Sequence, residues 1–342
     1  MPAVHLIEDG RGNESVLDGQ QRIKTIYDFF RDRIVIDGKS EPADEAILSL
    51  DGKRYSELPS QVRRQVQRFT LDIISLYDFE PSEPNELFFR LNQSYNLTPA
   101  EKRNALYGPT RDQVRSLVDQ LRDTGLLEKS AIAFSNGRLA YDDIIARTCV
   151  AIELNTLTTH INNNTVELFY RENTEGFSST TLSSLVTSSS ILLQQIQSSE
   201  RSVRFNKGTL QTWLLYCFWA PAETGPIPES LLSTLESLRL GLRRNSIPPE
   251  IAPHPAVQAI LRLYDDRSSY RVTGVSSVVA RDGCIHLLSN FLFKTTDHLG
   301  SANFCNCLEK DLDSANENVV MEFLSRANWG SSLLTKGGII NK

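Results

Sequence analysis

The feature that most constrains the fold is a polar segment, DGQQR at residues 18–22, which lies where one hydrophobic pattern gives way to another. Residues 3–7 and 14–17 are short, apolar and β-prone, and a charged loop containing Gly and Asn separates them. Such a pair predicts a β-hairpin. Beyond the DGQQR segment, apolar side chains recur at helical spacing as far as Phe30. The predicted order is therefore strand, tight glycine turn and helix.

The DGQQR segment has side chains suited to a phosphorylated ligand. Gly19 lets the backbone turn sharply and lets a ligand approach the main chain, and the following helix N-terminus offers unpaired N–H groups. Arg22 presents a planar fork of donors that matches phosphate. Gln20 and Gln21 can fix a base, a ribose or a water. Asp18 can hold a metal ion, orient Arg22 or position a nucleophilic water.

A second polar constellation spans residues 88–104, with FFRLN followed by LTPAEKRN after a short loop. Thr98, Pro99 and Glu101 form a complete helix start, because threonine caps, proline suits the first helical position and glutamate closes a capping box. The polar side chains of interest, which the sequence places on two short helices, are Arg90, Asn92, Glu101 and Arg103.

The residues of each constellation could also have a purely structural role. Asp18 would then be a common N-cap, and Gly19 would serve only the turn. Glu101 would be a capping residue, and Arg103 would be a solvated surface charge. The residues alone do not choose between these roles and ligand binding.

The rest of the chain divides into a mixed region and a helical region. Residues 34–36, 46–50 and 71–77 are predicted strands, and residues 58–69 a helix. After residue 110, helical patterns recur over 114–125, 141–154, 210–219, 229–243, 256–264 and 316–326, and the Ser/Thr-rich run 178–190 is predicted to be a polar-faced helix. We therefore predict an α+β chain with a small mixed-sheet domain over residues 1–108 and a mostly α-helical domain over residues 109–342.

Composition narrows the class of protein. Of the 342 residues, 40% are apolar and 23% are charged, which is typical of a globular chain. The formal net charge of −6 argues against a protein whose main task is to coat nucleic acid. The five scattered cysteines favour free thiols in a reducing compartment. The longest apolar stretch, residues 213–222, is too short to span a bilayer, so we expect a cytoplasmic protein with no membrane partner.

Neither a nuclease motif nor a metal site is predicted. The histidines are isolated from one another and from any nuclease context, and they are His5, His160, His254, His286 and His298. The acidic pairs at residues 142–143 and 265–266 have no lysine or histidine at a spacing that would favour a metal nuclease. His286 lies in an apolar run and is expected in the core.

Together, the two constellations resemble the signatures of the GmrSD-type N-terminal domain family. Residues 16–26, VLDGQQRIKTI, are similar to the hallmark of that family. FRLN at 89–92 followed by LTPAEKRNA at 97–105 looks like its second signature, an Asn-containing loop leading into a Glu-x-Arg-Asn helix. Two ordered blocks at the expected separation are more specific than either block alone. The resemblance covers residues 2–107.

The resemblance implies a ParB/sulfiredoxin-like N-terminal domain that acts in bacterial anti-phage restriction, where nucleotide binding and hydrolysis control the cleavage of modified phage DNA. It makes Asp18 and Arg22 the catalytic candidates. The implied nucleotide-binding residues, the last four of them as a supporting shell, are Gly19, Gln20, Gln21, Arg90, Asn92, Glu101 and Arg103. The implied ligand is a nucleoside triphosphate, with or without Mg²⁺.

The chain also departs from the family pattern. The family domain normally begins earlier, with a further strand and helix, so the domain is expected to be N-terminally incomplete and to lack part of its pocket. Family members often carry or pair with a His-Asn-His-type nuclease domain, whose motif is not found here.

Three hypotheses follow from these observations. In the first, the chain is a nucleotide-binding sensor, with NTPase activity left open, that regulates a nuclease on a partner chain, and its helical domain contacts that partner or DNA. In the alternative, it is a non-catalytic DNA-binding or protein-interaction module on an inactive ParB-like scaffold. The third is a stand-alone nuclease with an unrecognised site in the helical half, for which clustered carboxylates are missing.

Overall fold

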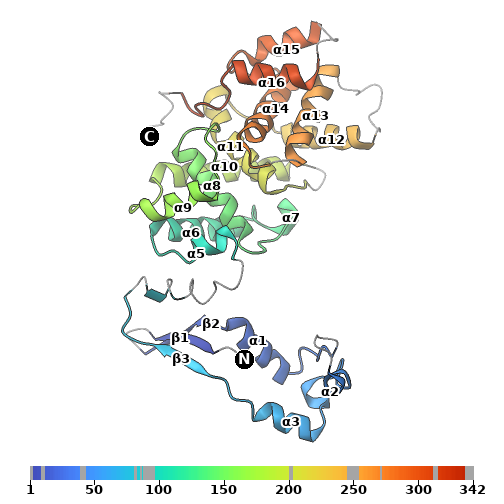
Figure 1. The fold of residues 1–342 in the computed structure, drawn as a ribbon. Helices are drawn as coiled ribbons and strands as arrows, with labels where there is room; N and C mark the ends of the chain where they lie inside the picture. The colour runs from blue at the N-terminus through green and yellow to red at the C-terminus, as the bar shows by residue number, and fades with distance from the viewer. Residues whose placement is uncertain are drawn as a thin grey trace. The chain divides into compact units, whose positions relative to one another are not determined.

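The structure is a computed structural model that describes residues 3–8, 12–38, 44–80, 83–84, 87, 97–199, 203–244, 254–269, 272–310 and 315–335. Packing divides the chain into two compact units, Met1–Leu97 and Thr98–Lys342. The first unit has a small sheet with short helices, and the described secondary structure of the second consists of helices (Figure 1). The predicted α+β class is therefore confirmed, and the predicted domain boundary at residue 108 stays a prediction.

The sheet of the first unit has three short strands: β1 (Val4–Glu8), β2 (Glu14–Asp18) and β3 (Ile73–Leu76). Their order is β2-β1-β3, with β1 antiparallel to β2 and parallel to β3, so the sheet is mixed as predicted. The β1–β2 pair is the expected hairpin. A β-bulge between His5 and Leu6 shifts its register, so that Leu6 faces Val16 but His5 faces Asp18.

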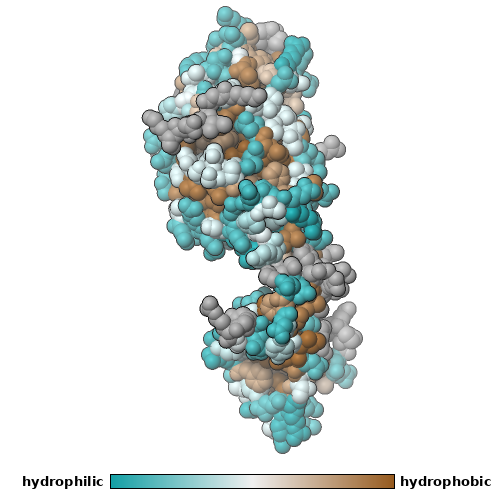
Figure 2. Space-filling view, turned by 90° about the vertical axis from the view of Figure 1, so that its left-hand side faces the viewer, coloured by the Kyte–Doolittle hydropathy of each residue, from teal (hydrophilic) through white to brown (hydrophobic). Residues whose placement is uncertain are grey.

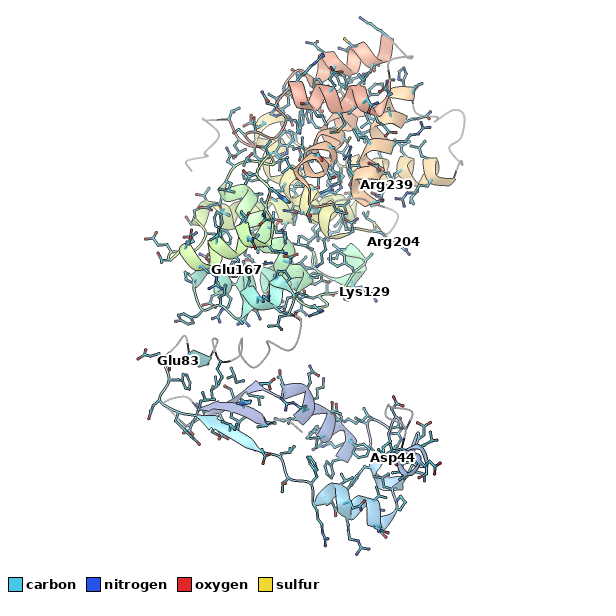
Figure 3. All side chains as sticks on the ribbon, in the orientation of Figure 1. Asp44, Glu83, Lys129, Glu167, Arg204 and Arg239 are labelled. Carbon is cyan, nitrogen blue, oxygen red and sulfur yellow. The ribbon has the colours of Figure 1, made fainter. Side chains whose placement is uncertain are left out.

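The helices in the described part of this unit include α1 (Gln20–Phe30), α2 (Glu45–Leu48), the 3₁₀ helix η1 (Tyr55–Glu57) and α3 (Ser60–Gln67). The predicted strand at 46–50 is wrong. The side chain of Asp44, which is labelled in Figure 3, accepts hydrogen bonds from the Ala46 and Ile47 amides and so starts a helical turn. The predicted strand at 34–36 is also wrong. Ile36 alone exchanges backbone hydrogen bonds with residues 52–53, which is too few for a ladder.

Few apolar side chains are buried in the first unit. Among its described residues, the buried large hydrophobics are Val4 and Leu58. Many others are exposed, including Ile73 at 58% and Phe69 at 59% of their surface. Figure 2 shows hydrophobic side chains at the surface of this unit, which lies at the bottom of that view. The hydrophobic effect therefore stabilises this unit much less than it stabilises the second one.

The second unit is a helical body. Its helices are α5 (Pro99–Asn104), α6 (Pro109–Asp123), α7 (Lys129–Ile132), α8 (Ala140–Glu153), α9 (Asn163–Glu172), α10 (Ser179–Gln197), α11 (Lys207–Thr224), α12 (Leu231–Arg244), α13 (Pro255–Ser269), α14 (Val275–Phe293), α15 (Ser301–Lys310) and α16 (Glu317–Arg326). The Ser/Thr-rich run falls inside α10, so its prediction as a helix is confirmed.

Two helices form the centre of the helical body. The α11 helix packs against α8, α10 and α14, and α14 packs against α13, α15 and α16. Both are apolar around most of their circumference, and they bury Trp213, Trp219 and His286, so the prediction that His286 is a core residue is confirmed. A helix buried on all sides needs no polar face, because it meets other helices in every direction.

A polar cluster sits inside this core. The Asp282 carboxylate accepts hydrogen bonds from the indole N–H groups of Trp219 (2.9 Å) and Trp329 (2.8 Å). Burial raises the pKa of Asp282 to about 7 against the effect of those two donors. Burial also lowers the pKa of the neighbouring His286 to about 3, so that its imidazole is neutral at physiological pH. Trp329 follows α16, so the cluster ties the end of the described chain to the core.

Candidate functional site

The DGQQR segment forms a corner where β2 ends and α1 begins. Asp18 is the last residue of β2, and Arg22 lies in the first turn of α1. The Asp18 Oδ2 atom accepts a hydrogen bond from Arg22 Nη2 at 2.5 Å, and Arg22 Nη1 donates to the Ala3 carbonyl at 3.1 Å. The side chains of Asp18 and Arg22 are 29% and 26% exposed. An acid and a guanidinium therefore meet at a place that solvent and a ligand can reach.

Gly19 makes this corner possible. It is the N-cap of α1 and has φ of 99°, a left-handed conformation that side chains rarely adopt. A Cβ atom at this position would lie 3.0 Å from Cγ2 of the buried Val4. The glycine therefore provides both the turn and the close approach of α1 to β1.

The structural explanation for Asp18 as a helix cap does not hold in the structure. Among the described residues, no side chain makes a capping hydrogen bond at the start of α1, and the Asp18 carboxylate is paired with Arg22 instead. Gln20 and Gln21 are exposed in the same first turn. Uncapped backbone N–H groups at a helix N-terminus favour anions, and a guanidinium beside them adds to that preference.

His5 lies beside this corner, although the sequence pattern did not predict any role for it. In the β1–β2 register His5 is opposite Asp18, and its Nδ1 atom is 4.0 Å from Asp18 Oδ2. The Nδ1 atom is buried and has no hydrogen-bonding partner among the described residues. Only the register reveals this neighbour, because the two residues are separated by the whole hairpin loop.

The second predicted constellation is only partly described. Arg90 and Asn92 lie outside the described residues. Glu101 forms the predicted capping box, in which its Oε2 accepts from the Thr98 amide (2.7 Å) and its own amide donates to Thr98 Oγ1 (3.3 Å). Glu101 also pairs with Arg138 at 2.9 Å, and this hydrogen bond lowers the pKa of Glu101 against the effect of burial.

Arg103 is a buried residue and not the solvated surface charge that its structural explanation assumed. It is 2% exposed, and its Nη2 donates to Asp143 Oδ1 at 2.5 Å. The same carboxylate oxygen accepts from Arg147 Nε at 3.1 Å, and Arg147 also donates to the Ile161 carbonyl and the Asn163 side chain. This ion cluster of Arg103, Asp143 and Arg147 joins α5 to α8 and to the start of α9.

The predicted site residues therefore fall into separate groups. The DGQQR residues 18–22 belong to the first unit, and the structure brings Asp18 and Arg22 into contact. Glu101 and Arg103 belong to the second unit, and each pairs with a residue of that unit. A nucleotide-binding role for any of them stays a prediction.

Each acidic pair that was considered for a nuclease has a carboxylate engaged in an ion pair. Asp143 belongs to the cluster with Arg103 and Arg147. Asp265 of α13 accepts from Arg239 at 2.6 Å, and Arg239 is labelled on α12 in Figure 3. Within the described ranges, no group of three or more His, Cys, Asp or Glu side chains is placed to hold a metal ion.

A large groove lies in the helical unit, between the ends of α10 and α11 and the loop that follows α11. Its volume is about 660 Å³, and its polar lining consists of carboxamides, one hydroxyl and one carboxylate, from Gln194, Gln195, Gln197, Ser198 and Glu229. The Gln195 amide is already bonded to the Pro228 carbonyl and the Leu232 amide. Because the described residues of its lining include no guanidinium or ammonium group, this groove suits a phosphate less well than the DGQQR corner does.

Comparison with known proteins gives one match. Residues 1–108 match the family model described as GmrSD restriction endonuclease, N-terminal domain. This match confirms the resemblance that the two sequence signatures indicated. Neither the curated proteins nor the solved structures include a significant match to the chain. In the described part of the chain, none of the helices combines the length and apolar character needed to cross a bilayer.

Proposed function

We propose that this chain is a nucleotide-binding module of a bacterial anti-phage restriction system, and that the DGQQR corner binds the nucleotide phosphates. The observation that carries the proposal is the Asp18–Arg22 pair, which sits at a glycine turn in front of an uncapped helix. The match of residues 1–108 to a restriction endonuclease domain supports the biological setting.

The corner offers two kinds of phosphate-binding group in one place. The N-terminus of α1 contributes backbone N–H groups and a partial positive charge, and Arg22 contributes a guanidinium. Gln20 and Gln21, both exposed, would contact the ribose, the base or a bound water. Before a nucleotide binds, Asp18 orients Arg22 through their hydrogen bond, and it is also the carboxylate of the corner that would hold Mg²⁺ beside the phosphates.

Hydrolysis is the further step of this proposal. Asp18 would orient a water so that its oxygen attacks the terminal phosphorus. The bond from that phosphorus to the bridging oxygen would break, and the nucleoside diphosphate would leave with that oxygen. The attacking water would lose its proton to Asp18 or to solvent.

A nuclease on a partner chain would carry out DNA cleavage. The sequence has no His-Asn-His motif, and arginines engage Asp143 and Asp265, one carboxylate of each acidic pair in the helical unit. The helical unit would contact that partner or DNA.

The test is a binding assay with the four labelled ribonucleoside triphosphates. Asp18→Ala and Arg22→Ala should each weaken binding about tenfold or more, because each removes a charged hydrogen-bonding group from the corner. The matched controls are Asp28→Ala and Arg33→Ala, which break an exposed ion pair of 3.1 Å at the other end of α1. The proposal would be refuted if both corner variants bound the nucleotides as tightly as wild type does. It would also be refuted if wild type bound none of the four nucleotides.

A second candidate is a non-catalytic interaction module. The exposed apolar side chains of the first unit favour it, since exposed hydrophobic patches are typical of protein-interaction surfaces. A salt-dependent DNA affinity that survives Asp18→Ala would favour the DNA-binding form of this candidate.

A further inference from the structure

The starting observation is a histidine that faces the motif carboxylate without bonding to it. His5 Nδ1 and Arg22 Nη2 both approach the same oxygen, Asp18 Oδ2, at 4.0 Å and 2.5 Å respectively. The first distance is too long for a hydrogen bond, and the second is a short one. The His5 side chain is only 13% exposed, and its Nδ1 atom is buried with no partner among the described residues.

The β-bulge is what produces this arrangement. Without it, the pairing of Leu6 with Val16 would continue to place His5 opposite Leu17, and the side chains would alternate accordingly. The bulge inserts one residue and puts Asp18 opposite His5. Bulges often re-aim a side chain next to a functional site.

Phosphate binding by Arg22 would disturb its pair with Asp18. A guanidinium that turns toward a phosphate no longer neutralises the carboxylate fully, and the carboxylate then lies near a second negative group. A carboxylate in a partly buried place needs a replacement donor, because an unpaired charge is unfavourable there. The terminal torsion of aspartate is broad, and Asp18 is partly exposed, so its carboxylate can rotate toward a new partner.

We propose that His5 is a positioning residue for Asp18, and that it takes over this carboxylate when Arg22 engages a phosphate. In the tautomer that carries the proton on Nδ1, His5 offers a donor 4.0 Å from the oxygen that Arg22 would release. The inference rests on the proposed nucleotide-binding function. It assigns His5 no contact with the nucleotide, because its role acts through Asp18.

Two substitutions at His5 distinguish hydrogen-bond donation to Asp18 from simple packing within the strand. His5→Leu fills the position without a donor. His5→Asn places its amide nitrogen near the position of Nδ1, so it keeps the donor at a similar distance from the backbone. Each change is made in the wild-type chain and in an Asp18→Asn chain, which gives a double-mutant cycle. Thermal melting of every variant reports whether the fold is retained.

The measured quantity is the dissociation constant for whichever labelled ribonucleoside triphosphate the full-length wild type binds. His5→Leu should weaken binding about tenfold, and His5→Asn should stay within about twofold of wild type. In the Asp18→Asn chain, His5→Leu should add less than about a twofold loss, since its partner is already altered.

Two outcomes would overturn the inference while leaving the proposed function intact. One is that His5→Leu weakens nucleotide binding by the same factor in the wild-type chain and in the Asp18→Asn chain, which would indicate that His5 has a structural role alone. The other is a His5→Asn variant as weak as His5→Leu. A wild-type chain that binds none of the four nucleotides overturns the proposed function first, and the role of His5 fails with it.

Discussion

Removal of the Asp143 side chain should destabilise the helical unit strongly. Asp143 is the shared acceptor of two arginines, Arg103 at 2.5 Å and Arg147 at 3.1 Å. The side chains of these arginines are 2% and 11% exposed, so each would be left with its charge uncompensated in a poorly solvated place. Breaking a buried ion pair by removing one partner costs about 3–5 kcal/mol. We therefore expect Asp143→Ala to lower the free energy of unfolding by an amount in this range.

The assay is thermal and urea unfolding, followed by circular dichroism. For a unit of this size, each kcal/mol lowers the Tm by about 2–4 °C, so Asp143→Ala should lower it by about 6–20 °C. Arg103→Met should cost less, because Asp143 keeps Arg147 as a partner and the methionine fills the buried space. The control is Glu167→Ala, which breaks the exposed pair with Arg171 and should cost less than about 1 kcal/mol.

The ranking is as informative as the magnitude. If Asp143→Ala melts within about 2 °C of wild type, or no lower than Glu167→Ala, then the cluster does not hold α5 on the helical body and the reasoning is refuted. An Arg103→Met variant less stable than Asp143→Ala would also contradict it.

Three further predictions concern local structure. Gly19→Ala should destabilise the first unit by about 1–2 kcal/mol because of its left-handed φ of 99°, and contact of the new Cβ with Val4 should add to this loss. The loss should appear as faster amide hydrogen exchange in β1 and α1, and unchanged exchange rates would argue against it. Thr98→Ala should lower the free energy of unfolding by about 1 kcal/mol, because it removes the N-cap of α5. Urea unfolding measures this loss, and a free energy of unfolding equal to that of wild type would mean that the cap contributes nothing. Asp282 has a pKa raised to about 7 from the ordinary value of 3.8, so the folded state binds the extra proton between these values. Wild-type Tm should therefore fall relative to that of Asp282→Asn as the pH rises from about 4 to about 7, and a constant difference across this range would be inconsistent with the raised pKa.

The local signals in the sequence predicted local structure well. The Thr98–Glu101 capping box begins α5 as expected, and the hairpin followed by a glycine turn and a helix is present at residues 4–30. These elements are determined by neighbouring residues, so a short window of sequence contains enough information. The strand predicted at 46–50 was wrong for the same kind of reason: Asp44 is a strong helix cap, and its effect outweighs the apolar run after it.

Features that depend on distant contacts were not predictable in this way. The α14 helix has no solvent-exposed polar face because its middle is buried on all sides, so its amphipathic periodicity is too weak to reveal it. Arg103 pairs with Asp143, which lies 40 residues later in the sequence, and a charged residue on a short helix is more often solvated. His5 faces Asp18 only because of a bulge, and a single-residue shift of register cannot be read from β-prone segments alone.

The scarcity of buried apolar side chains around Val4 and Leu58 has a consequence for how a ligand would be detected. A unit with so little core should open locally far more often than the helical body, and its backbone should be the first to be cut by a protease. A molecule that binds only the closed form shifts this balance by mass action, by about 2.7 kcal/mol at a hundredfold excess over its Kd. Occupancy of the DGQQR corner should therefore appear as slower digestion confined to the first unit, whether or not any bond in the ligand is broken.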